Sequence, residues 1–138
     1  MTGEPLTPLV RSPTAVQLFA FSAVTWNSHR IHYDADYARN EEGYPDVLVQ
    51  SHLHACFLGQ AALEPWGPGA RLAQLGWQNR GIAVPGDTLT ITGTVVSTTA
   101  EPGGDTRLEL TLEERNQRDE LCVQGWATVL LPAGEERG

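Results

Sequence analysis

The segment SHLHACFLGQAAL, residues 51–63, decides the fold. It predicts a helix that begins near Ser51, whose hydroxyl can cap the helix, and that ends before Pro65. Leu53, Phe57 and their apolar neighbours occupy most of the circumference of this helix. Because few of its side chains suit water, we expect other elements to enclose the helix and to bury both residues.

Four segments after this helix have the character of β-strands. Apolar and polar side chains alternate in residues 88–95 and 107–113, and a third strand is expected over residues 121–131. Residues 71–84 form a fourth, less regular strand. The connections between them contain glycine, proline, asparagine and aspartate, and they are too short for parallel crossovers. The strands are therefore predicted to form an antiparallel meander.

An apolar helix and a sheet with one apolar face fit together in an economical way when the sheet wraps around the helix. This arrangement, called the hotdog fold, belongs to the α+β class. We expect it to occupy residues 12–132 as a single domain. An N-terminal arm or short first strand precedes it in residues 1–11, and a C-terminal tail follows in residues 133–138.

Two shorter helices are expected before the central one. Thr14 can cap a helix that runs through Val24. Asp34 can cap a second helix over residues 36–40. The spacing of apolar residues predicts that the first helix buries one face, formed by Val16, Phe19, Ala20 and Val24.

The composition indicates a soluble intracellular domain. The chain has 138 residues, a net charge of −8 and no lysine, so we expect no nucleic-acid partner, because phosphate neutralisation supplies much of that affinity. Its apolar stretches are shorter than the ~20 residues that span a bilayer, and its N-terminus lacks the order of a secretion signal. We therefore expect no membrane partner and a cytoplasmic location, with Cys56 and Cys122 as reduced core residues.

Four histidines lie in the N-terminal half of the chain and could in principle bind a metal ion. The loop around the first two does not have the ligand spacing of a tight zinc site, and an arginine between them disfavours a nearby dication. We therefore expect no metal. The residues considered for this role are His29, His32, Asp34, His52 and His54.

Proton transfer suits this loop better. His32 lies near an amide side chain, Asn27, and precedes the start of the central helix. An imidazole exchanges protons near neutral pH, and an uncapped N–H at a helix start can stabilise an oxygen that gains negative charge. The alternative is that His32 is a packed loop histidine bonded to the backbone.

The segment Asn27-Ser28-His29-Arg30-Ile31-His32-Tyr33-Asp34 resembles the MaoC-type hotdog dehydratases and hydratases. It is most similar to the branch of mesaconyl-CoA hydratase and the fungal mitochondrial hydroxyacyl-thioester dehydratase. The block of residues 80–93, with its Pro-Gly-Asp turn, is also similar to that family. The resemblance covers residues 12–131.

The resemblance implies a hydro-lyase that adds or removes water across the α,β bond of an acyl-CoA or acyl-carrier thioester, without a cofactor. His32 takes the position of the family's catalytic histidine, and Asn27 takes the position of its usual aspartate. An amide is not a base, so His32 is expected to transfer protons while Asn27 orients water or hydroxyl. His29→Ala is expected to keep most activity, since the family pattern assigns the chemistry to His32.

The start of the central helix departs from the family pattern. The resemblance implies a glycine there, whose N–H polarises the thioester carbonyl, but this chain has Ser51 after Gln50. Gln50 fits the pattern as a substrate-binding residue. Ser51 keeps the N–H, and its side chain can cap the helix or crowd a ligand.

Four further residues are candidates for substrate binding. Arg30 can meet a phosphate of coenzyme A or pair with a surface carboxylate, and Arg80 is a second candidate for that phosphate. Tyr33 and Tyr44 can line an acyl pocket or be packed rings. We expect one or both of these arginines to interrupt the acidic surface at the mouth of the site.

A single hotdog chain leaves one sheet edge unpaired, so we expect a homodimer, or a heteromer with a second hotdog chain. The alternative function is a weakly catalytic or non-catalytic subunit that binds acyl thioester or completes the site of a partner. A hotdog thioesterase is disfavoured because no carboxylate lies at the helix start; Glu64 lies beyond the far end.

Overall fold

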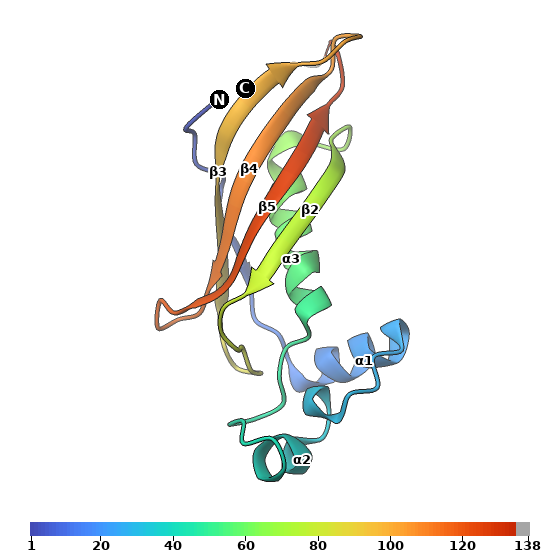
Figure 1. Ribbon diagram of the computed structural model, residues 1–138, viewed down its shortest axis with the longest axis vertical. Coiled ribbons are helices and arrows are strands. Elements are labelled where there is room, and N and C mark those ends of the chain that lie inside the picture. The colour runs from blue at the N-terminus through green and yellow to red at the C-terminus, as the bar shows by residue number, and fades with distance from the viewer. Residues whose placement is uncertain (135–138) are drawn as a thin grey trace.

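A five-stranded antiparallel sheet covers the helix α3 (Ser51–Leu63) in the computed structural model, which describes residues 1–134 (Figure 1). The strand order across the sheet is β1-β3-β4-β5-β2. This is the predicted hotdog arrangement, and α3 has the predicted bounds. The strands are β1 (Leu9–Arg11), β2 (Arg71–Asn79), β3 (Leu89–Ala100), β4 (Thr106–Arg115) and β5 (Leu121–Leu131).

The sheet differs from a simple meander at β2. Only β3, β4 and β5 follow one another as neighbours, whereas β2 pairs with β5 at the opposite edge from β1. The strand also ends at Asn79 and not near Val84, because the chain must cross the end of the sheet to reach β3. Two backbone N–H groups at this crossing, those of Arg80 and Gly81, donate to the carbonyl oxygen of Cys122.

The first eleven residues contain the short strand β1, which the sequence allowed as an alternative to an arm. β1 pairs with β3, and Gly3 and Leu6 donate backbone hydrogen bonds to carbonyl groups of β3. These residues therefore belong to the sheet. The last four residues of the expected C-terminal tail, 135–138, lie outside the described part of the chain.

The core forms between α3 and the inner face of the sheet. Leu53 and Phe57 are buried, as predicted, against leucines of β4 such as Leu110. Cys122 is buried, but the expectation that Cys56 is a core residue is wrong, because it lies on the side of α3 that the sheet leaves open. No helix within residues 1–134 is long and apolar enough to cross a membrane.

A buried polar pair joins α3 to β4. His54 Nδ1 lies 2.7 Å from Glu114 Oε1, and both side chains are shielded from water. Burial raises the pKa of Glu114, although His54 acts in the opposite direction. The pair therefore fixes the first turns of α3 against the sheet. The pattern of apolar residues does not predict this contact, because both of its side chains are polar.

Helix α1 (Ala15–Thr25) begins as predicted but buries a different face. Thr14 Oγ1 accepts a hydrogen bond from the Gln17 N–H, which confirms the cap. The predicted buried face is wrong: Val16 is 77% and Val24 is 80% exposed, and Phe19 and Ala20 are exposed too. The helix projects from the body below the sheet and contacts it through one narrow side, with Leu18 and Ser22 buried (Figure 1).

Candidate functional site

The candidate site begins where α1 ends. Trp26 adopts a left-handed backbone conformation, with φ 57°, and its side chain is 91% exposed. The chain then forms a loop and η1 (Arg30–His32), a single turn of 3₁₀ helix. Asp34 caps the next helix, α2 (Ala35–Asn40), by accepting from the Tyr37 N–H, as the sequence predicted.

His32 has a defined proton position. Its side chain is nearly buried, and Nδ1 lies 2.8 Å from the carbonyl oxygen of Leu48. A carbonyl oxygen only accepts hydrogen bonds, so Nδ1 carries the proton and Nε2 keeps its lone pair. Burial lowers the pKa of His32; the bond to the Leu48 carbonyl acts in the opposite direction, and the nearby His29 lowers it further. His32 therefore makes the backbone hydrogen bond that a packed loop histidine would make. The same bond leaves its imidazole neutral, with Nε2 as a free basic nitrogen.

Residues 47–50 tie this histidine to the start of α3. The Leu48 N–H donates to the Ile31 carbonyl at 2.8 Å, next to the bond from His32. Gln50 is fully buried, and its Nε2 donates to the Leu18 carbonyl at 2.7 Å and to Ser22 Oγ at 2.9 Å. The side chain of Gln50 therefore connects α3 to α1 and does not reach the surface where a ligand would bind.

Ser51 is the first residue of α3 and not its cap. The cap position belongs to Gln50, which makes no side-chain capping bond. Ser51 Oγ accepts hydrogen bonds from Trp77 Nε1 and Asn79 Nδ2, both at 2.9 Å. The hydroxyl is thus held by β2, and the Ser51 N–H has no acceptor within residues 1–134. It lies at the positive end of the helix dipole, where an anionic oxygen is stabilised.

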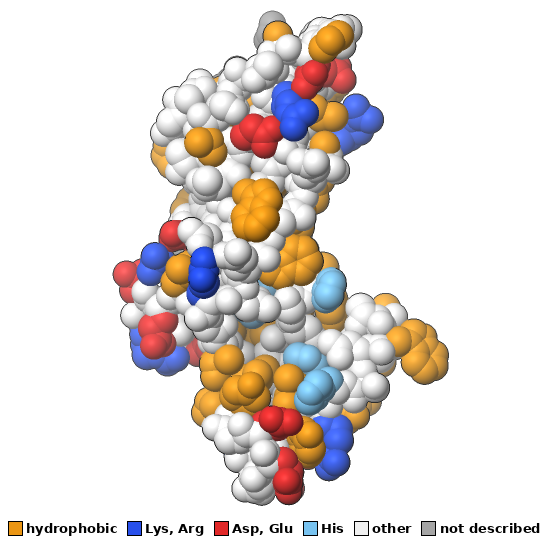
Figure 2. Space-filling view, viewed as in Figure 1, with side chains coloured by type: hydrophobic (Ala, Val, Ile, Leu, Met, Phe, Trp, Pro, Cys, Tyr) orange, Lys and Arg blue, Asp and Glu red, His pale blue; other side chains and the backbone are white. Residues whose placement is uncertain are grey.

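Asn27 and His29 lie in the loop before His32. Asn27 Oδ1 accepts a hydrogen bond from the His29 N–H at 3.4 Å. His29 Nδ1 accepts from the Ile31 N–H at 3.3 Å, and its ring lies edge to face with the ring of His32, 6.1 Å between centroids. Figure 2 shows histidine side chains gathered on this face, between the sheet and the lower helices.

Arg30 lies beside His32 and has a local carboxylate partner. Its Nη2 lies 2.9 Å from Asp34 Oδ2, and its guanidinium lies over the ring of Tyr37. The hydrogen bonds from the Tyr37 N–H and from Arg30 hold the pKa of Asp34 below its usual value. Arg30 therefore forms the ion pair with a surface carboxylate that the sequence allowed as an alternative. Its side chain is still more than half exposed.

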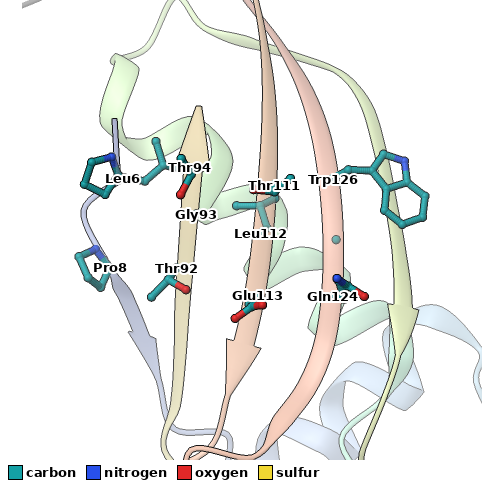
Figure 3. A pocket seen from close by; sticks show the side chains of 12 residues that line it. Leu6, Pro8, Thr92, Gly93, Thr94, Thr111, Leu112, Glu113, Gln124 and Trp126 are labelled. Carbon is teal, nitrogen blue, oxygen red and sulfur yellow. The ribbon is translucent and has the colours of Figure 1, made fainter. Parts of the chain in front are cut away.

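Arg80 is not brought to this site within one chain. Its Nη2 donates to Gln78 Oε1 at 2.6 Å and to Gln124 Oε1 at 3.3 Å. Gln124 lines the outer face of the sheet, opposite α3 (Figure 3). Arg80 is therefore directed away from the loop by its bonds to Gln78 and Gln124, and Arg30 remains the candidate for the phosphate.

The two tyrosines differ in their surroundings. Tyr33 Oη donates to the Ser28 carbonyl, and its ring packs edge to face against Phe19 of α1. Tyr44 is half-buried in the loop after α2, where its N–H donates to the Ala38 carbonyl. Tyr33 therefore belongs to the wall next to Asn27, whereas Tyr44 belongs to the loop that leads toward α3.

A small cavity of about 230 Å³ adjoins the loop. Its volume is below the ~300–1,000 Å³ of typical small-molecule pockets. A larger hollow of about 820 Å³ lies on the outer face of the sheet, and no histidine of residues 1–134 lines either cavity (Figure 3). The cavity next to the loop is lined by Phe19, Ser22, Ala23, Trp26, Asn27, Ser28 and Tyr33.

The side chains considered as metal ligands do not converge. His54 is bonded to Glu114 inside the core, and His52 packs its ring against Trp77 at 5.5 Å between centroids. Within residues 1–134, no group of three or more histidine, cysteine, aspartate or glutamate side chains is arranged to hold a metal ion.

Residues 6–83, more than half of the chain, match the sequence model of a family described as hydroxyacyl-thioester dehydratase type 2. The mesaconyl-C(4)-CoA hydratase of Chloroflexus aurantiacus is 56% identical over 45 residues, which are 33% of this chain and 16% of that protein. The mitochondrial hydroxyacyl-thioester dehydratase type 2 of Saccharomyces cerevisiae is 32% identical over 78 residues, 56% of this chain and 27% of that protein. The matched parts span no more than 27% of these relatives.

Solved structures share the fold at low sequence identity. The (R)-hydratase from A. caviae involved in PHA biosynthesis has a TM-score of 0.81 and 22% identity, covering 96% of this chain and 97% of that chain. The MaoC-like dehydratase from Rhodospirillum rubrum has a TM-score of 0.84 and 18% identity, with 99% and 95% covered. A chain of the ChsH1-ChsH2 complex from Mycobacterium tuberculosis has a TM-score of 0.84 and 17% identity, with 96% and 98% covered.

Proposed function

The chain belongs to the hydroxyacyl-thioester dehydratase type 2 family, and on that premise we propose that it adds or removes water across the α,β bond of an acyl thioester. The observation that carries the proposal is the linkage between a base and an oxyanion donor. His32 keeps an unprotonated Nε2 because its Nδ1–H is bonded to the Leu48 carbonyl. Ser51, three residues after Leu48, is the first residue of α3, and its N–H has no acceptor within residues 1–134. The reaction needs both groups, and the segment of residues 48–50 runs from the carbonyl that binds His32 to the first residue of α3.

In the dehydration direction, His32 Nε2 takes the α-proton of the 3-hydroxyacyl thioester. The electron pair of the C–H bond moves toward the thioester carbonyl, whose oxygen becomes enolate-like and accepts the Ser51 N–H. The C–O bond at the β-carbon then breaks, and the imidazolium of His32 returns its proton to the departing hydroxyl. The products are the enoyl thioester and water, with His32 neutral again. Hydration runs through the same steps in reverse.

The proposal assigns the remaining polar residues by their surroundings. Asn27 orients the water or hydroxyl, and Arg30, exposed beside His32, approaches a phosphate of coenzyme A or of a carrier-protein arm. Tyr33 lies in the wall of the small cavity and would contact the acyl group. Tyr44, in the loop that leads toward α3, is proposed as a second contact. Gln50 becomes a positioning residue because its amide is bonded to α1. No cofactor or metal takes part in the proposed steps.

We further infer that a partner chain pairs with β2. This strand is an edge of the sheet, is nine residues long and carries the exposed positions Ala73 and Gln74, so its outer backbone groups have no protein partner within residues 1–134. The small size of the cavity beside Asn27 also fits a site completed by a second chain. A homodimer is the first expectation, and a heteromer with another hotdog chain is the second; two chains of similar structure come from complexes, ChsH1-ChsH2 and HadBC of Mycobacterium tuberculosis.

The second candidate function is a weakly active or inactive subunit that supports the site of a partner chain. Asn27 favours this candidate, because an amide stands where the family usually has a carboxylate.

The experiment that separates the two candidates is a hydration assay on the purified chain with crotonyl-CoA and several bulkier enoyl-CoAs. Loss of the enoyl absorbance at a rate proportional to protein concentration supports the enzyme. If the chain turns over no enoyl or hydroxyacyl thioester, alone or with a hotdog partner chain, the enzyme proposal fails and the subunit candidate replaces it.

A further inference from the structure

His29 and His32 hold opposite tautomers. His32 Nδ1 faces the carbonyl oxygen of Leu48, which only accepts, so its proton is on Nδ1 and Nε2 is bare. His29 Nδ1 faces the N–H of Ile31, which only donates, so Nδ1 is bare and the proton is on Nε2. The backbone therefore presents an acceptor nitrogen on one ring and a donor N–H on the other.

The two rings are neighbours in the same loop. Their centroids lie 6.1 Å apart, edge to face, in one loop. Two ring nitrogens that bind the same oxygen at about 2.9 Å each lie up to about 6 Å apart. Sharing one water or hydroxyl therefore requires the two Nε2 atoms to face it from within that separation. A water molecule that is about to lose a proton needs a donor on its lone pair and an acceptor for its hydrogen. A pair of imidazoles with opposite tautomers provides both.

We propose that His29 is a positioning residue for the reacting oxygen. In hydration, the His29 Nε2–H donates to the oxygen of the attacking water while His32 Nε2 removes the proton of that water. In dehydration, the same N–H donates to the departing β-hydroxyl, and the proton for the leaving water comes from His32, so His29 undergoes no net change. This inference rests on the proposed hydro-lyase function.

The proposal also explains how an amide can stand at Asn27. The Asn27 carbonyl oxygen is turned toward the backbone N–H of His29 and therefore supports the loop that carries the donor. The oxygen-holding task that the resemblance assigns to a carboxylate is then shared by Asn27 and His29. This differs from the expectation drawn from the sequence, in which His29 has no part in the reaction.

Two substitutions separate the two roles of His29, in which Nδ1 accepts from the Ile31 N–H and Nε2–H donates to the reacting oxygen. The Asn side chain in His29→Asn places an oxygen where Nδ1 was, so it can still accept from the Ile31 N–H, but it lacks a donor at the reach of Nε2. The Gln side chain in His29→Gln reaches farther and can place an amide N–H near the former Nε2. We expect kcat for crotonyl-CoA hydration to fall about tenfold to hundredfold in His29→Asn with KM changed less than threefold. His29→Gln should recover part of that loss.

Long-range ¹H–¹⁵N NMR of the histidine rings tests the premise without activity. The expected spectrum has the Nδ1–H tautomer for His32 and the Nε2–H tautomer for His29. The inference is overturned if both rings have the same tautomer, or if the wild type hydrates crotonyl-CoA and His29→Asn does so at an equal rate. A wild type with no turnover on any enoyl thioester overturns the proposed function instead, so the two failures are distinct.

Discussion

The proton on Nδ1 of His32 determines what this residue can do. The bond to Leu48 fixes that proton, and the free Nε2 is the only basic atom of the ring. Burial lowers the pKa of His32, so the neutral form persists to lower pH than for an exposed histidine.

This pKa direction predicts the acidic limb of the pH profile. Dehydration begins with neutral His32, so kcat/KM should fall as the pH falls through the pKa of His32 in the folded protein, which lies below the ordinary value of 6.5. We expect kcat/KM for a 3-hydroxyacyl-CoA to stay level from pH 8 to about 6.5 and to decrease below that. An acidic limb centred above pH 7 would contradict this assignment.

Substitutions at Asn27 test how the loop orients the oxygen. Asn27→Asp keeps an acceptor for the His29 N–H and restores the residue more common in the family, so turnover should be retained or rise. Asn27→Ala removes that acceptor and should give a turnover between those of the wild type and His32→Ala. The measurement is kcat for enoyl-CoA hydration. An Asn27→Ala variant as active as the wild type would exclude a role for this side chain.

The sequence predicts which residues of the loop take part in the reaction but not the bonds that hold them. Asn27, His32 and Ser51 were identified from their spacing and from a family pattern. The bonds of Ser51 to Trp77 and Asn79 were not predicted, because their donors lie 26 and 28 residues away on a strand whose register the sequence does not specify. For the same reason Gln50 was assigned to substrate binding, although its amide reaches α1.

At the scale of the elements, the start of α3 allows the proposed oxyanion donor to be tested by a single substitution. Gln50 has φ −64° and ψ 144°, a conformation that a following proline requires, and Ser51 is the first helical position, where proline is well tolerated. A backbone donor can therefore be removed here without breaking the helix.

We predict that Ser51→Pro folds but lowers kcat by about 10²–10³-fold, because it removes the N–H proposed to bind the thioester oxygen. Ser51→Gly is the matched control, since it loses the same bonds to Trp77 and Asn79 but keeps the N–H; its kcat should stay at least tenfold above that of the proline variant. Circular dichroism confirms folding of both. Equal kcat values in the two variants would show that the N–H takes no part in the reaction.

The element predictions succeeded where an apolar pattern faces a core and failed where it does not. The bounds of α3 and β5 followed from the sequence, since both elements are packed on the inside of the molecule. The apolar spacing in α1 has no such core to face, because the helix projects from the body and leaves Val16 and Val24 exposed. The crossing between β2 and β3 was missed because pairing order is a property of the whole sheet.

For the whole molecule, the open edge at β2 and the exposed face of α1 predict assembly with another chain. Like charges placed along one edge strand repel across a two-fold axis. The double substitution Ala73→Lys with Gln74→Lys should therefore shift the dimer toward monomer at least tenfold in dissociation constant, measured by sedimentation velocity. The control, Thr99→Lys with Ala100→Lys, places the same charges at the exposed end of β3 and should leave assembly unchanged.

A wild-type chain that stays monomeric at concentrations of about 100 μM, far above the Kd range of specific interfaces, contradicts the homodimer and leaves the heteromer as the assembly to test. Equal dissociation constants for the two lysine variants would instead place the interface away from β2.

The most direct test of the account is the turnover of His32→Ala beside that of the wild type. Loss of a base that acts in the transition state should lower kcat for enoyl-CoA hydration by about 10²–10⁴-fold, with little change in substrate affinity and a folded protein. That result places the proton transfer at His32. An active wild type with an equally active His32→Ala variant would contradict the central claim.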